Sequence, residues 1–115
     1  MSKLPNHAAA IIADQKLTDY LLSSTHHEGS PKAKFFESFG FSRQKPEVLR
    51  HALLVHAEKG DVLATTVSQY GTTYDVNAQL ETPDGRNPWL LVIWMIDVGM
   101  DQPRLITAIP SEDMA

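Results

Sequence analysis

The stretch from His26 to Lys32 combines residue types that can bind an anion and move a proton. Gly29 lets the backbone approach a ligand closely, and histidine exchanges protons near neutral pH. Lys32 falls in the first turn of a predicted helix, whose free N–H groups already favour a negative charge. Lysine is mildly unfavourable at that end of the helix dipole, and a residue that breaks a local rule often has a function. The structural alternative is a solvated lysine beside a surface histidine.

The remaining histidines do not form a recognisable metal site. His26 and His27 are adjacent, so their side chains need not face one site. His51 and His56 are five positions apart, whereas two metal ligands on one helix face stand at i and i+4. We expect His56 to pack in the core, with its ring nitrogens satisfied by backbone or water. Because cysteine is also absent, we expect neither a metal ion nor another cofactor.

Two arginines in the second half of the chain could also reach a phosphate. Arg86 lies in the turn Asp84-Gly85-Arg86, and Arg104 begins the last predicted strand. The alternative for Arg86 is a solvated turn residue. The sequence has no P-loop, dinucleotide fingerprint, nucleophile elbow or zinc-protease motif. Nucleotide hydrolysis, hydride transfer and serine or metal proteolysis are therefore not expected.

Charge is unevenly distributed between the two halves of this 115-residue chain, whose net charge is −4. Residues 1–60 carry eight basic and six acidic side chains, and residues 61–115 carry two and eight. The acidic total argues against a protein that binds any polyanion without selectivity. An anionic ligand would prefer the first half, although uneven solvation of two faces explains the same pattern.

The elements that must position these residues change character at Gly60. Before it, apolar residues recur with helical spacing, and after it they alternate as in half-buried strands. The pattern predicts an α+β fold in which three N-terminal helices pack on a C-terminal four-stranded antiparallel meander. We expect a single domain, residues 1–115, with a loosely held arm at residues 1–8. Ile11-Ile12 is either a short edge strand or a plug for the core.

The predicted element boundaries come from capping residues and turn signals. The helices are expected to begin at Asp14, at Ser30-Pro31 and at Pro46, and the strands to span Val62–Val67, Tyr74–Leu80, Trp89–Ile96 and Arg104–Ile109. The third strand is apolar on both faces, so we place it centrally and expect it to be the most buried. Its apolar run is far shorter than the ~20 residues that span a bilayer. The N-terminus also lacks a signal-peptide stretch, so we expect a soluble, cytoplasmic protein that contacts no membrane.

Several segments of the sequence resemble a small bacterial family of toxin-associated domains. The first half carries Lys16-Leu17-x-x-Tyr20-Leu21-Leu22, followed by His26-x-x-Gly29-x-x-Lys32-Ala33-x-Phe35-Phe36-x-x-x-Gly40-Phe41. The second half carries Tyr70-Gly71-x-x-Tyr74, Leu80 to Arg86, Trp94 and Pro103 to Pro110. The family's helices and four-stranded meander are in turn similar to the barnase–EndoU–colicin–RelE-like ribonuclease group.

This resemblance implies a ribonuclease-like toxin of a bacterial toxin–antitoxin or conflict system, cleaving RNA without a metal ion. The 2′-hydroxyl would attack the neighbouring phosphorus and leave a 2′,3′-cyclic phosphate. The matching positions are His26 as acid–base group, Lys16, Lys32 and Arg86 as phosphate ligands, and Thr107 as hydrogen-bond donor. We expect His26, Lys32 and Arg86 to converge at the start of the second helix. The expected partners are RNA and a cognate antitoxin or immunity protein.

Two other functions fit the same sequence. Free ribonucleases usually offer a basic groove, so the acidic balance favours a non-catalytic interaction module or partner subunit in a two-gene bacterial system. The second of these functions is a small-ligand binding protein that uses the concave face of the sheet.

Overall fold

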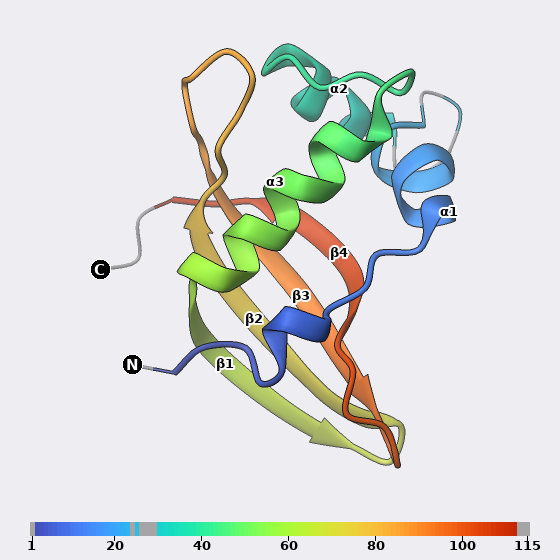
Figure 1. Cartoon of the computed structure of the whole chain (residues 1–115), viewed down its shortest axis with the longest axis vertical. Coiled ribbons are helices and arrows are strands. Elements are labelled where there is room, and N and C mark those ends of the chain that lie inside the picture. The colour runs from blue at the N-terminus through green and yellow to red at the C-terminus, as the bar shows by residue number, and fades with distance from the viewer. Residues whose placement is uncertain (1, 24, 26–29, 113–115) are drawn as a thin grey trace.

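Helices cover one face of an antiparallel sheet in the computed structural model, which describes residues 2–23, 25 and 30–112 (Figure 1). The helical elements are the 3-10 turn η1 (His7–Ala9), α1 (Asp14–Lys16), the π-helical turn η2 (Leu17–Leu21), α2 (Ser30–Ser38) and α3 (Pro46–Lys59). The strands are β1 (Asp61–Ser68), β2 (Gly71–Gln79), β3 (Trp89–Asp97) and β4 (Arg104–Pro110). They pair in the order β1-β2-β3-β4, which confirms the predicted α+β meander.

The longest helix, α3, runs diagonally across one face of the sheet (Figure 1). It begins at Pro46, whose missing N–H costs nothing in the first turn, and Gly60 follows its last residue. Its buried residues recur at three- and four-residue intervals: Leu49, Ala52, Leu53, His56 and Ala57. This apolar stripe joins the sheet in one hydrophobic core.

The central strand β3 lies between β2 and β4, as the sequence predicts. Its burial alternates, however, and only Leu90, Val92 and Trp94 are fully buried. Leu91 and Ile93 point to the opposite face and are half-buried. Although β3 is apolar on both faces, only one face is fully buried, because the helices of the described chain cover that side alone.

The N-terminal segment is attached to the domain more firmly than the sequence suggests. The sequence predicts a loosely held arm at residues 1–8, whereas Leu4 is 1% exposed. The carbonyl of Ser2 also accepts a hydrogen bond from the N–H of Val62 at 2.8 Å. Both alternatives for Ile11-Ile12 apply in part, since Ile11 forms an isolated parallel bridge with Arg104 and Ile12 is buried in the core. Over the residues that the structure describes, no helix has the length and apolar character needed to cross a membrane.

The core contains a polar side chain, His56 of α3, which is 1% exposed. Its Nε2 lies 2.7 Å from the carbonyl oxygen of Leu90 and donates a hydrogen bond to it, which ties α3 to β3. Burial lowers the pKa of His56, and the hydrogen bond to Leu90 offsets this only in part. His56 is therefore a neutral core residue, as predicted, although of its two ring nitrogens Nδ1 has no hydrogen-bond partner among the described residues.

Neighbouring leucines of β3 test the one-sided burial of the sheet. Leu90→Ala should reduce the free energy of unfolding by about 2–5 kcal/mol, because it leaves a cavity in the core. Leu91→Ala, the matched control on the half-buried face, should cost roughly 1 kcal/mol. Denaturant titration of both variants measures the difference. Equal losses would contradict the assignment of the two faces.

The buried histidine makes a second prediction, on pH. Because the pKa of His56 is lower in the folded chain than in the unfolded one, the unfolded chain binds more protons below the ordinary value of ~6.5. The free energy of unfolding should show no loss from His56 above that pH. Below it, this free energy should fall by up to about 1.4 kcal/mol per pH unit. His56→Gln should flatten this dependence in denaturant titrations. The control His51→Gln, at an exposed position of the same helix, should keep the wild-type slope.

Candidate functional site

A β-bulge in the edge strand β4 creates the candidate site. Trp94 pairs with Leu105 and Ile93 pairs with Thr107, so Ile106 is an extra residue with no partner on β3. The ammonium of Lys16, at the end of α1, donates a hydrogen bond to the carbonyl of Ile106 at 3.0 Å. A carbonyl of the bulge thus holds the Lys16 ammonium, from the N-terminal half of the chain, at the outer edge of the sheet.

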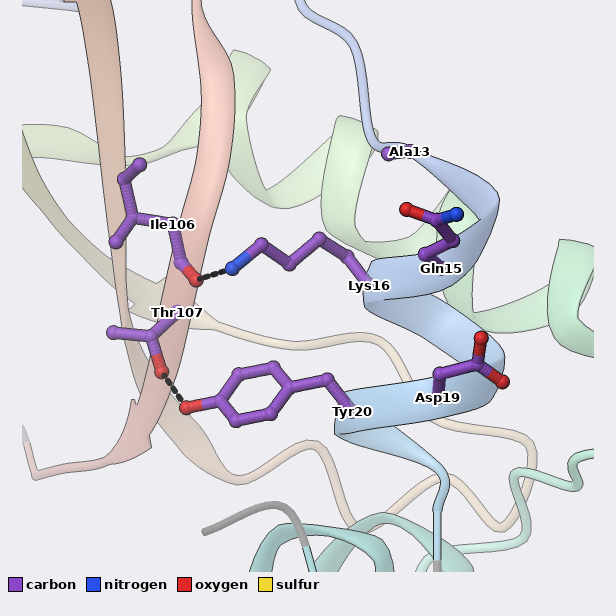
Figure 2. Close-up of a pocket in the computed structure, with 7 residues that line it drawn as sticks. All are labelled: Ala13, Gln15, Lys16, Asp19, Tyr20, Ile106 and Thr107. Carbon is purple, nitrogen blue, oxygen red and sulfur yellow. Dashed lines mark hydrogen bonds between the residues drawn. The ribbon is translucent and has the colours of Figure 1, made fainter. Parts of the chain in front are cut away.

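Two hydroxyl groups meet beside this lysine. The Tyr20 hydroxyl and the Thr107 Oγ1 are 2.9 Å apart and share a hydrogen bond. The Lys16 ammonium also lies 5.0 Å from the centre of the Tyr20 ring, within the range of a cation–π contact. Figure 2 shows these side chains bridging the gap between the helical segment and β4.

These side chains line an open pocket of about 680 Å³. Gln15 and Asp19 contribute further polar groups to its wall. Asp19 forms an ion pair with Arg43 at 3.5 Å, so its charge is partly offset. The described residues that line it are Ala13, Gln15, Lys16, Asp19, Tyr20, Ile106 and Thr107. A pocket of this size with two hydroxyls and an ammonium has room for a nucleotide-sized anion.

Lys32 reaches the same strand from α2. Its ammonium donates to the carbonyl of Ala108 at 2.8 Å, two residues beyond the carbonyl that Lys16 contacts. Two residues along a strand correspond to about 7 Å, so the structure brings both predicted phosphate ligands to one edge. An ammonium has three N–H donors, and each of these contacts occupies one. Both lysines therefore keep donors for a ligand while attached to the sheet.

The predicted acid–base group, His26, lies outside the described residues, together with Gly29. Its convergence with Lys32 and Arg86 therefore stays a prediction. The structure places Lys32 in the first turn of α2, whereas Arg86 contacts the carbonyl of Ser38, the last residue of that helix. Within the part of the chain that is described, Arg86 does not line the pocket that contains Lys16 and Thr107.

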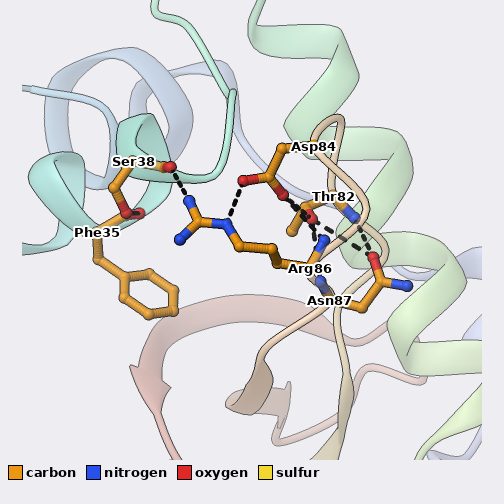
Figure 3. Close-up of polar contacts among 6 residues, drawn as sticks. All are labelled: Phe35, Ser38, Thr82, Asp84, Arg86 and Asn87. Atoms are coloured by element: carbon orange, nitrogen blue, oxygen red, sulfur yellow. Dashed lines mark hydrogen bonds and ion pairs between the residues drawn. The ribbon is translucent and has the colours of Figure 1, made fainter.

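Arg86 makes several intramolecular contacts, of which Figure 3 shows those with Asp84 and Ser38. Its Nε donates to the Asp84 carboxylate at 2.6 Å, and its guanidinium carbon lies 4.3 Å from the centre of the Phe39 ring. The backbone N–H of Arg86 is the main cause that lowers the pKa of Asp84, and the guanidinium adds to it. These contacts fasten the β2–β3 loop to the end of α2.

Arg104, the other arginine considered for phosphate binding, is paired in a similar way. Its Nε and a terminal nitrogen donate to the two carboxylate oxygens of Asp97, at 2.8 and 3.1 Å. This two-pronged pair joins the ends of β3 and β4. Among the described residues, no group of three or more histidine, aspartate or glutamate side chains could hold a metal ion.

Tyr20 is part of the motif that resembles the family, but the sequence predicts no role for it in the site. Its ring does pack against the core, but its hydroxyl reaches Thr107, 87 positions away. One signal is present in the sequence: Tyr20 follows Lys16 by four residues, which places a cation and a phenol on the same helix face. The contact with Thr107 depends on the docking of the helix against β4, which local spacing does not encode.

Comparison with known proteins gives a family and a fold. The fold is similar to a chain of the contact-dependent growth inhibition toxin–immunity protein complex from Klebsiella pneumoniae 342, with a TM-score of 0.73. The two chains are 17% identical, and the likeness covers 93% of this chain and 97% of that one, so it concerns the fold alone. No curated protein matches the sequence. Residues 3–112 match a family described as Domain of unknown function (DUF6883), and the chain belongs to that family.

Proposed function

We propose that this chain is a toxin domain of a bacterial toxin–antitoxin or conflict system and that it cleaves RNA without a metal ion. The observation that carries the proposal is the pair of lysines, Lys16 and Lys32, which bind the carbonyls of Ile106 and Ala108 on one strand edge, beside the hydroxyls of Tyr20 and Thr107. The likeness in fold to a chain of a growth-inhibition toxin–immunity complex supports the same class of system.

The proposed reaction uses the geometry of the β4 edge. A ribose 2′-hydroxyl loses its proton to His26 and attacks the adjacent phosphorus, while the bond to the 5′-oxygen breaks. His26 then returns the proton to that leaving oxygen, so a 2′,3′-cyclic phosphate and a 5′-hydroxyl are formed. The five-coordinate phosphorus carries extra negative charge on its oxygens. Lys16 and Lys32 neutralise this charge, and Thr107 donates a hydrogen bond to it.

The acidic composition does not prevent this chemistry, because the cations gather at one edge. Lys16 and Lys32 come from the half of the chain in which basic residues outnumber acidic ones. Both ammonium groups are partly buried against β4, where solvent screens them less than at a fully exposed position. A small number of strong phosphate contacts, instead of a broad basic groove, would then provide the affinity.

In this proposal Arg86 anchors the end of α2, and Lys32 is the residue of that helix that binds phosphate. A phosphate bound by Arg86 would compete with Asp84 and with the carbonyl of Ser38 for the same guanidinium. Arg86→Ala should therefore loosen α2 and lower stability in denaturant titrations before it affects RNA binding. If Arg86→Ala instead lowers RNA affinity and leaves stability unchanged, Arg86 is a phosphate ligand and not an anchor of α2.

A cognate inhibitor belongs to the same proposal, because a free ribonuclease would damage the cell that makes it. The similar chain belongs to a complex of a toxin with an immunity protein. We propose that this chain is held by an antitoxin or immunity protein. A non-catalytic interaction module is the competing function, and the experiment below separates the two.

Induced expression in bacteria tests the site through growth and RNA integrity. The wild type should arrest growth and cleave RNA, and His26→Ala should lower the cleavage rate about 10²- to 10⁴-fold, as expected for an acid–base group. Lys16→Ala and Lys32→Ala should each lower it by about 10²- to 10³-fold, because each removes one cation from the transition state. Lys34→Ala is the matched control, since Lys34 is an exposed lysine on the same helix as Lys32.

Binding to a non-cleavable RNA distinguishes a lysine that contacts phosphate from one that only supports the fold. Removing one phosphate contact should reduce the slope of log affinity against log salt by about 0.7. Lys16→Ala and Lys32→Ala should show this change and Lys34→Ala should not. If the folded wild type binds no RNA and leaves cellular RNA intact, the interaction-module function replaces the proposal.

A further inference from the structure

The two edge strands of the sheet, β1 and β4, differ in how much of their outer backbone is hydrogen-bonded. Along β4, Ile11 pairs with the strand through bonds to Pro103 and Leu105, and Lys16 and Lys32 occupy the next outward carbonyls. Along β1, the bond from Val62 to Ser2 is the one backbone contact that the described residues make with the outer edge. Figure 1 shows β1 at the margin of the sheet, with no described element beside its second half, toward the turn to β2.

The open part of β1 lacks the features that normally protect an edge strand. Edge strands usually carry lysine, proline or inward-pointing charges that discourage pairing with another chain. Residues 62–74 contain no charged side chain and no proline, in a chain of which 21% is charged. All side chains from residue 63 to 68 are exposed, including Leu63 at 50% and Val67 at 78%. The irregularity in the pairing of β1 with β2 lies at Leu63, so the strand beyond it is regular and suited to pair with another strand.

The hairpin register identifies which backbone groups are open. The two-residue loop closes on the pair Ser68–Gly71, and antiparallel pairs alternate between bonded and non-bonded from that point. The register also pairs Thr66 with Thr73, so Thr66 faces β2 in the same way as Ser68. Thr65 and Val67 consequently turn their N–H and C=O groups away from β2.

We propose that two copies of this chain pair through β1 in antiparallel orientation, about a two-fold axis at Thr66. Thr65 of each copy then lies opposite Val67 of the other, and their outward groups exchange hydrogen bonds on both sides of the axis. The two Thr66 side chains face each other at the axis itself. The two sheets become one continuous sheet, with four strands from each copy.

Self-complementarity identifies a second copy as the occupant. A two-fold axis places every residue of the segment opposite a residue of the same segment, so any charge would meet a like charge nearby. None is present between residues 62 and 74. The central pairs join β-branched side chains, which pack well across antiparallel strands. At the start of the strand, Asp61 is neutralised by Lys3 at 3.2 Å.

The proposed dimer is independent of the proposed ribonuclease activity. β1 and β4 are opposite edges of the sheet, so pairing through β1 leaves the pocket of Lys16, Tyr20 and Thr107 accessible. A few residues of strand bury less than the ~1,200 Å² of a standard interface. The dimer should therefore be weak and concentration-dependent.

Sedimentation velocity of the purified chain tests the association. Between about 10 and 500 µM, the range expected for a small interface, the wild type should shift from monomer to dimer. Thr66→Lys places two ammonium groups opposite each other at the axis and should remain monomeric throughout. Val48→Lys, at an exposed position 43% accessible on α3, is the control and should behave as the wild type. Circular dichroism of each variant confirms that the fold is kept.

Disulfide formation tests the register, because the chain contains no cysteine. Antiparallel residues at a non-bonded pair have Cα atoms about 4.5 Å apart, within the disulfide range of about 4.4–6.8 Å. Thr66→Cys should thus form a covalent dimer under mild oxidation, faster than Val48→Cys at equal concentration. A wild type that stays monomeric, or a Thr66→Cys variant that crosslinks no faster than Val48→Cys, would overturn the proposal.

Discussion

The burial of one face of the sheet against α3 and the N-terminal helices is the constraint on which the rest of the structure depends. Trp94, Val92 and Leu90 of β3 are completely buried on that side, and α3 supplies Leu49 and Leu53 to the same core. The helical half must therefore lie over the sheet, and its first and second helices extend toward β4. The cations of the first half reach the sheet at that edge because of this packing, since nothing in their local sequence directs them there.

A lysine that caps a carbonyl at a strand edge has two effects. It satisfies an outward-facing backbone acceptor, which protects the edge from pairing with another chain. It also fixes the position of a positive charge that still has free donors. The bulge at Ile106 is what makes this possible for Lys16, because the extra residue changes which carbonyls of β4 face outward. The same contacts that protect the edge thus assemble the candidate site.

The elements, and the positions of the candidate lysines within them, could be predicted from the sequence because their signals are local. Pro46 and the change of period after Gly60 identify α3 and β1, and Ser30-Pro31 marks the start of α2 with Lys32 in its first turn. The one-sided burial of β3, the bulge in β4 and the contact made by Tyr20 could not be predicted, because each depends on how distant segments pack or pair. The role of Arg86 could not be predicted for a different reason. An arginine that could bind phosphate can equally bind a carboxylate and an aromatic ring, as Arg86 does. Residue type defines what a side chain can bind, but the neighbours that folding supplies decide what it does bind.

The two edges of the sheet differ in charge, as the two halves of the sequence do. The β4 edge holds two ammonium groups on adjacent outward carbonyls, and the β1 edge has no charge over the length at which its backbone is open. An anion is attracted to the first edge, while desolvating the second costs little because it carries no ionic group. In the two proposals, a chain with an acidic total therefore offers one surface to RNA phosphates and another to a second copy of itself. The sheet keeps the two surfaces apart, because β2 and β3 always separate its edges.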